Sequence, residues 1–151
     1  MPRNLTAWTG FDALTHAIEA FLVPSFNPLC DAMALEALKL ISRFLPVAYN
    51  EPNNISARAG MLVGSCLAGV SFLKGLGLVH SISHMIGAEY NTHHGLTNAI
   101  VLPVVLRFNL EGMDSQTATI AQNMHLEESS AAKLISDCLL YTSPSPRDKR
   151  Q

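Results

Sequence analysis

The chain has 151 residues, of which 48% are hydrophobic and 15% charged, and its formal net charge is −2. This length and composition predict a globular domain with a buried core and exclude a disordered chain. The small negative charge, without a basic stripe, argues against nucleic acid as a partner. Three cysteines without a CxxC pair favour a reduced, cytoplasmic setting.

Apolar residues recur at helical spacing along most of the chain. Thr9 is expected to cap the first helix at its N-terminus, and Pro103 is expected to bend or break the fifth. We find no alternating strand pattern and no internal repeat, so the sequence predicts an all-α, bundle-like domain. The expected helices cover residues 9–22, 29–45, 56–73, 78–88, 96–108, 114–124 and 127–140.

The most apolar segment is AGMLVGSCLAGVSFL, residues 59–73. Fifteen apolar residues followed by Lys74 are too few to span a bilayer, so we expect a buried helix and no membrane partner. Gly60, Gly64 and Ala68 recur every four residues, which predicts that another helix packs closely against this face.

The last residues, TSPSPRDKRQ, contain no aliphatic side chain and end in a charge run. Such a segment cannot bury surface. The string CLLYTSPSPRDKRQ also resembles a translated sequencing-adapter scar. We therefore expect an all-α metal-binding domain over residues 1–137 and a disordered, non-native tail over 138–151.

Four of the six histidines fall within residues 75–95. His80 and His84 are four residues apart, which places both imidazoles on one helix face. Asp12 and His16 have the same spacing in an earlier helix. After the His80 helix, a short loop leads to His93 and His94. Two helices and a loop could therefore bring these side chains to one point.

A carboxylate with several imidazoles suits a divalent ion such as Fe²⁺ or Zn²⁺. Taken singly, each feature has a simpler explanation: a surface histidine pair, a carboxylate near a helix N-terminus, or an exposed loop histidine at His93. His125 lies among polar residues and is expected on a solvated face, whereas Met85 and Ile86 are expected in the core. The combination favours a metal, because unpartnered polar groups are costly to bury in apolar helices.

The blocks TGFDALTHAIEAF, NPLCDAMALEALKLI, ARAGMLVGSCLAGVSF and GLGLVHSISHMIGAEYNTHHGLTNAIVLP occur in this order between Leu5 and Asn109. Together they resemble the iron-containing alcohol dehydrogenase family. The resemblance implies four metal ligands, Asp12, His16, His80 and His94, and places His84 near the nicotinamide and the substrate, as a candidate proton shuttle. His93 stands where the family usually has a proline.

The resemblance also implies a dehydroquinate synthase-like α-domain and a reversible, NAD- or NADP-linked oxidation of a small alcohol by a homo-oligomeric enzyme. No glycine-rich phosphate loop follows a strand in this chain. We therefore expect a truncated enzyme that lacks its N-terminal α/β dinucleotide-binding domain and is inactive alone. The alternatives are a zinc enzyme of glycerol dehydrogenase or dehydroquinate synthase type, and a non-catalytic metal-binding module.

Overall fold

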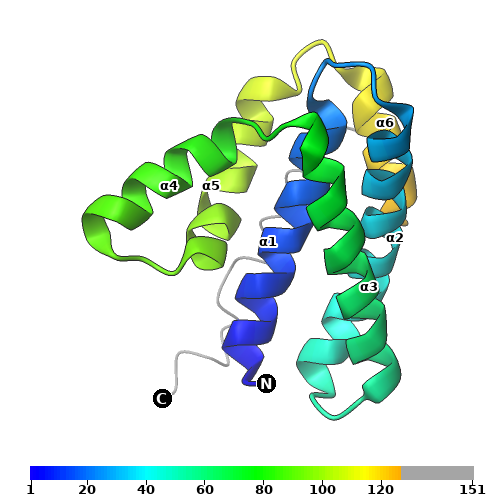
Figure 1. Ribbon diagram of the computed structural model, residues 1–151, viewed down its shortest axis with the longest axis vertical. Coiled ribbons are helices and arrows are strands. Elements are labelled where there is room, and N and C mark those ends of the chain that lie inside the picture. The colour runs from blue at the N-terminus through cyan, green and yellow to red at the C-terminus, as the bar shows by residue number, and fades with distance from the viewer. Residues whose placement is uncertain (127–151) are drawn as a thin grey trace.

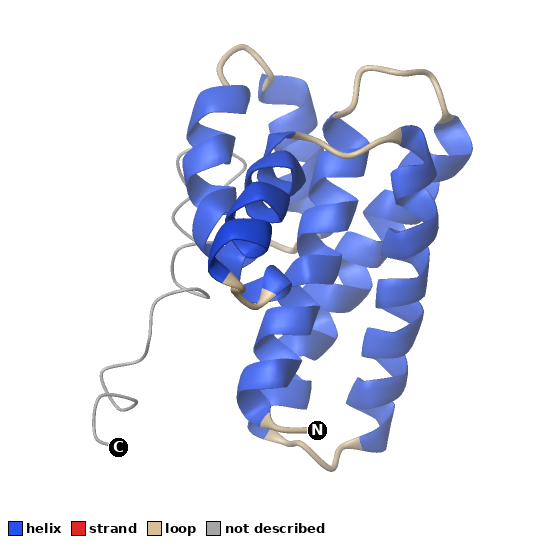
Figure 2. Ribbon diagram, turned by 60° about the vertical axis from the view of Figure 1, so that its left-hand side comes forward, coloured by secondary structure: helices blue, strands red, loops and turns tan. Residues whose placement is uncertain are grey.

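The computed structural model describes residues 1–126, and within this range every regular element is a helix (Figures 1 and 2). The all-α prediction is confirmed. The last expected helix, 127–140, and the boundary between 137 and 138 lie outside the described residues. The elements are α1 (Arg3–Leu22), α2 (Pro28–Asn50), α3 (Ile55–Ser71), η1 (Phe72–Lys74), α4 (Leu78–Tyr90), α5 (His94–Asn109) and α6 (Asp114–Asn123).

Helix α1 is central in the fold, with α2 and α3 on one side and α4 and α5 on the other (Figure 1). It packs directly against α2, α3 and α5, while α4 packs on α5. The core between these helices is aliphatic, and Ile18, Leu38 and Leu102 are completely buried in it. Because α1 is enclosed in this way, its polar side chains facing α4 and α5 are held in a rigid frame.

Two expected helix boundaries differ from the structure by several residues, and Pro103 does not break its helix. Thr9 is not an N-cap: α1 begins at Arg3, and the Thr9 hydroxyl donates to the Leu5 carbonyl one turn earlier, at 2.8 Å. Helix α2 continues through Pro46 to Asn50, and α5 continues through Pro103 to Asn109. In both, buried residues beyond the proline, such as Ala48 and Leu106, keep the last turns packed on the core.

The small-residue face of α3 packs against α2, as predicted. A Cβ at Gly60 would collide with the ring of Phe44, and one at Gly64 would lie 2.9 Å from Ile41. The apolar run is longer than expected, however: the 20 residues Ile55–Lys74 are long and apolar enough to cross a membrane by length and composition. The helix is not the buried one that was expected, because only 28% of this window is buried and Leu62, Val63 and Leu73 are exposed. Length and composition alone are weak evidence for a membrane span.

Helix α4 extends away from α2 and α3 (Figure 1). Its apolar residues are therefore less buried than their sequence suggests. Met85, expected in the core, is 72% exposed, and Ile86 is half-buried. His125 is exposed, as expected. The part of α4 that the fold does bury is its first two turns, which carry Val79, His80 and Ser83.

Candidate metal centre

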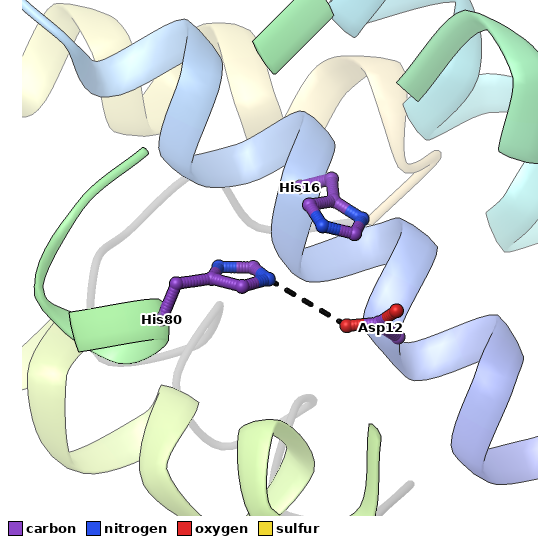
Figure 3. Close-up of side chains that lie close together, drawn as sticks. All are labelled: Asp12, His16 and His80. Atoms are coloured by element: carbon purple, nitrogen blue, oxygen red, sulfur yellow. Dashed lines mark ion pairs between the residues drawn. The ribbon is translucent and has the colours of Figure 1, made fainter. Parts of the chain in front are cut away.

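Asp12, His16 and His80 converge between α1 and α4 (Figure 3). Each offers one ligand atom, and these atoms all lie within 4.8 Å of one another. The His16 and His80 rings are stacked with their centroids 4.4 Å apart, and His80 Nε2 lies 3.6 Å from Asp12 Oδ1. The i, i+4 spacing on α1 thus works as the sequence predicts, and α4 supplies the third side chain.

A carboxylate that the sequence analysis did not single out holds His80 in place. Glu19 is only 4% exposed, and its Oε2 lies 2.6 Å from His80 Nδ1. It also accepts backbone N–H groups of Val79, at 2.7 Å, and His80, at 3.3 Å. These bonds satisfy two of the amide groups that the start of a helix leaves unpaired. Glu19 therefore joins α1 to the N-terminus of α4 and orients the imidazole.

Gly77 makes this contact possible. A Cβ at this position would lie 2.7 Å from Glu19 Oε1 and push the carboxylate away from α4. Gly77 is also the N-cap of α4 and provides no side-chain hydrogen bond to it. The carboxylate of Glu19, which belongs to α1, caps α4 instead.

His94 lies beside the cluster, with Nε2 3.4 Å from Asp12 Oδ1, but it is not in the set whose ligand atoms are all mutually close. It is the first residue of α5, and the next residue, Gly95, brings that helix against α1. A Cβ at Gly95 would collide with the Trp8 carbonyl oxygen. This close approach positions His94 next to Asp12.

The neighbouring residue His93 makes different contacts. His93 is the N-cap of α5, where its Nδ1 accepts the backbone N–H of Leu96 at 3.4 Å. Its ring packs on Trp8, with centroids 4.7 Å apart. Of the two adjacent histidines, the structure brings only His94 into contact with Asp12 and His80.

His84 lies at the edge of the cluster and is exposed. Its ring is 6.1 Å from that of His80, in an edge-on arrangement, and 5.0 Å from that of His94. It lies one turn beyond His80 on α4 and therefore nearer to solvent. This position suits a group that exchanges protons with a bound molecule.

Asn98 is a second residue that the sequence analysis missed. It lies one turn after His94 on α5 and is completely buried. Its Nδ2 donates to Asp12 Oδ1 at 2.6 Å and lies 3.2 Å from His80 Nε2 and 3.1 Å from His94 Nε2. The only available signal was a polar amide directly before the apolar run of residues 99–106.

The charges in the cluster are strongly coupled. Burial alone would raise the pKa of Asp12, but the hydrogen bond with His80 and the charge of His16 bring it below its ordinary value. Burial would lower the pKa of His80, yet hydrogen bonds to Asp12 and Glu19 raise it to about 9. Burial lowers the pKa of His16 and of His94, which favours neutral imidazoles with free lone pairs.

This donor set fits a divalent first-row ion. It combines one carboxylate oxygen with imidazole nitrogens on a partly buried face, and no cysteine within residues 1–126 takes part. The bond from Glu19 to His80 is the carboxylate support typical of metal-binding histidines. A further buried polar atom, Asn98 Oδ1, has no hydrogen-bond partner among the described residues.

A family model and several known proteins match the chain as a whole. The family model "Fe-containing alcohol dehydrogenase family, C-terminal" matches residues 6–140. The NAD-dependent methanol dehydrogenase of Bacillus methanolicus is 45% identical over 122 residues, which are 80% of this chain and 32% of that protein. The 1,3-propanediol dehydrogenase of Citrobacter freundii is 44% identical over 82% of this chain and 32% of its own length.

A crystal structure of a 1,3-propanediol oxidoreductase superposes with a TM-score of 0.89 and 39% identity, covering 94% of this chain and 39% of that one. The chain thus spans about a third of the length of the curated relatives that it matches. The family match continues beyond Asn109, where the resemblance found in the sequence ends, to residue 140. The chain belongs to the iron-containing alcohol dehydrogenase family, of which it carries the C-terminal helical region.

Proposed function

We propose that this chain is the metal-binding part of an NAD- or NADP-linked alcohol dehydrogenase that interconverts a small alcohol with its aldehyde or ketone. The observation that carries the proposal is the convergence of Asp12, His16 and His80 around one point, supported by the buried Glu19. We include His94 as the fourth ligand, because its Nε2 lies beside Asp12. Fe²⁺ or Zn²⁺ is the ion that these donors suit.

Each residue then has a defined task. Asp12 and His16 present ligand atoms from α1, and Glu19 accepts the Nδ1 hydrogen of His80 so that Nε2 faces Asp12. An ion held there would supply Lewis-acid polarisation of an alcohol or carbonyl oxygen. His84, exposed next to His94, would carry a proton between the substrate hydroxyl and solvent.

The names of the relatives support the substrate and cofactor classes. They include an NAD-dependent methanol dehydrogenase, a 1,3-propanediol dehydrogenase and an NADPH-dependent butanol dehydrogenase. These names support the alcohol branch of the family over a zinc-dependent polyol dehydrogenase, a dehydroquinate synthase or a non-catalytic module. We propose that the nicotinamide is bound with the help of a dinucleotide-binding domain, as the resemblance implies.

The setting of the enzyme is also a proposal. Cys30 and Cys66 are free thiols, which supports a reduced, cytoplasmic compartment. Exposed apolar residues on α5, namely Ile100, Val104 and Phe108, support contacts with further protein, either the rest of the enzyme or another subunit of a homo-oligomer. The modest net charge of −2 gives no reason to expect nucleic acid, and we propose no membrane role.

The proposal can be tested in two stages. First, the 151-residue chain is titrated with Zn²⁺ or, without oxygen, Fe²⁺, and the bound metal is counted; we expect one ion, lost in His80→Ala. Second, the chain replaces the matching third of the Bacillus methanolicus enzyme, and NADH formation from short alcohols is followed. The activity should disappear with His80→Ala. Absence of metal binding by the chain, or activity that survives His80→Ala, would contradict the proposal.

A further inference from the structure

Asn98 gathers three of the four proposed ligand atoms around one amide group. Its Nδ2 lies 2.6 Å from Asp12 Oδ1, 3.1 Å from His94 Nε2 and 3.2 Å from His80 Nε2. Asn98 itself is 0% exposed, whereas its partners Asp12 and His94 are partly exposed. No other amide side chain in the described range has hydrogen bonds to the candidate ligands.

The orientation of this amide follows from its shortest contact. Turning the amide over would place its oxygen about as close to Asp12 Oδ1 as the nitrogen is now, and two oxygens without a shared proton would repel. Nδ2 must therefore face Asp12. The cost is that Asn98 Oδ1 is buried without a hydrogen-bond partner. Because the fold leaves this buried acceptor unpaired, the contact between Nδ2 and Asp12 contributes more to the arrangement than a hydrogen bond to Oδ1 would.

The amide cannot satisfy every acceptor around it. It has two hydrogens, and it faces a carboxylate oxygen and two imidazole nitrogens. When His80 is neutral, its Nδ1–H donates to Glu19 and its Nε2 carries a lone pair. Asn98 can then serve Asp12 and one imidazole at a time. In this neutral state, which a metal ion requires of the imidazole, removing the donor would leave three lone-pair atoms facing one another on a partly buried face, which is unfavourable.

We propose that Asn98 is a positioning residue that preassembles Asp12, His80 and His94 as a ligand set and thereby sets the affinity of the site for a divalent ion. The inference rests on the proposed metal site and adds to it a residue outside the four ligands. An ion would take over the acceptors that Nδ2 now joins. Because the ligand atoms are already gathered, little rearrangement of α1, α4 and α5 is needed.

Two substitutions separate positioning from simple packing. Asn98→Leu keeps a side chain of similar size but removes the amide donor, so the dissociation constant for Zn²⁺ should rise about 10–100-fold, as for other residues that orient metal ligands. Asn98→Asp replaces the donor by a negative acceptor. It should destabilise the metal-free chain, yet Zn²⁺ should bind at least as tightly as to the unchanged chain, because the added charge attracts the ion.

The measurements are a competition titration with a chromogenic zinc chelator and thermal unfolding with and without Zn²⁺. We expect the metal-induced rise in melting temperature to be largest for Asn98→Asp and smallest for Asn98→Leu. The control is Asn53→Asp in the exposed turn between α2 and α3, which should behave as the unchanged chain.

The outcomes distinguish this inference from the proposed function. If the unchanged chain binds one Zn²⁺ and both Asn98 variants bind it equally well, Asn98 only packs and the inference is wrong, while the metal site stands. If the two variants lose Zn²⁺ affinity to the same extent, the predicted gain or retention of affinity in Asn98→Asp is wrong, and positioning of the ligands by a donor is refuted. If the unchanged chain binds no metal, both proposals fail.

Discussion

Replacing Glu19 by glutamine should weaken metal binding without touching a proposed ligand. Glu19 accepts three N–H groups with its two oxygens: His80 Nδ1 at 2.6 Å and the backbone amides of Val79 and His80. Glutamine has one acceptor oxygen and one NH₂ group. At least one of the three donors would therefore face another donor.

Either placement of the glutamine is harmful. If its NH₂ faces His80, the ring must accept at Nδ1 and carry its hydrogen on Nε2, which removes the lone pair directed toward Asp12. If its NH₂ faces the backbone amide of Val79, that amide loses its acceptor, and Gly77 supplies no side-chain replacement. Hydrogen bonds to a charged group contribute about 1.5–3 kcal/mol, so the metal-free chain should lose about that much unfolding free energy. The affinity for Zn²⁺ should fall about 10–100-fold.

The assay pairs urea unfolding of the metal-free chain with a zinc competition titration. Glu36→Gln is the matched control, since Glu36 is exposed and contacts only Lys39, at 3.1 Å, among the ion pairs of the described residues. An exposed pair of this kind contributes little, so that variant should match the unchanged chain in both measurements. The reasoning about Glu19 is refuted if Glu19→Gln binds Zn²⁺ as tightly as Glu36→Gln.

Three further predictions concern protonation, packing and catalysis. The pKa of His80 is raised from 6.5 to about 9, so the metal-free chain should lose up to about 3 kcal/mol of unfolding free energy as the pH rises between these two values. Saturating Zn²⁺ should remove that loss. Urea unfolding at several pH values, with and without Zn²⁺, measures the change. The lowered pKa values of His16 and His94 affect the unfolding free energy only below pH 6.5, outside the pH range in which His80 titrates. Gly95→Ala should destabilise the chain by about 1–3 kcal/mol in thermal unfolding and weaken zinc binding, because the new methyl group collides with the backbone of α1. The control Gly69→Ala has open space around the new methyl group and should be neutral or stabilising. In the chimeric enzyme, His84→Ala should keep its metal and lose about 10²-fold in turnover, whereas His80→Ala should lose the metal; equal metal loss in both would contradict separate roles.

The helical fold, and within the candidate site the placement of Asp12 beside His16, could be predicted from the sequence because both depend on local periodicity. The i, i+4 spacing of Asp12 and His16 places both side chains on one face of a helix, whatever the rest of the chain does. The boundaries were less predictable. Thr9 can cap a helix or bond to a carbonyl one turn back, and only the packing of α1 from Arg3 onward decides between them.

The supporting residues could not be predicted because they depend on how helices meet. Glu19 becomes important only when Gly77 allows α4 to approach α1, and Asn98 only when Gly95 brings α5 against Trp8. Met85 shows the opposite error: an apolar residue in an apolar helix was expected to be buried, yet α4 extends from the bundle and leaves it exposed. The resemblance to a family supplied His94, which spacing alone left undecided against His93.

We propose that one divalent ion binds between α1, α4 and α5. A crystal structure of the chain grown with Zn²⁺, with data collected at the zinc absorption edge, tests it most directly. We predict one strong anomalous peak about 2.0–2.2 Å from a carboxylate oxygen of Asp12 and from imidazole nitrogens of His16, His80 and His94. A peak at His93 or His125 instead, or no ordered zinc near Asp12 in crystals that contain the ion, would contradict the account.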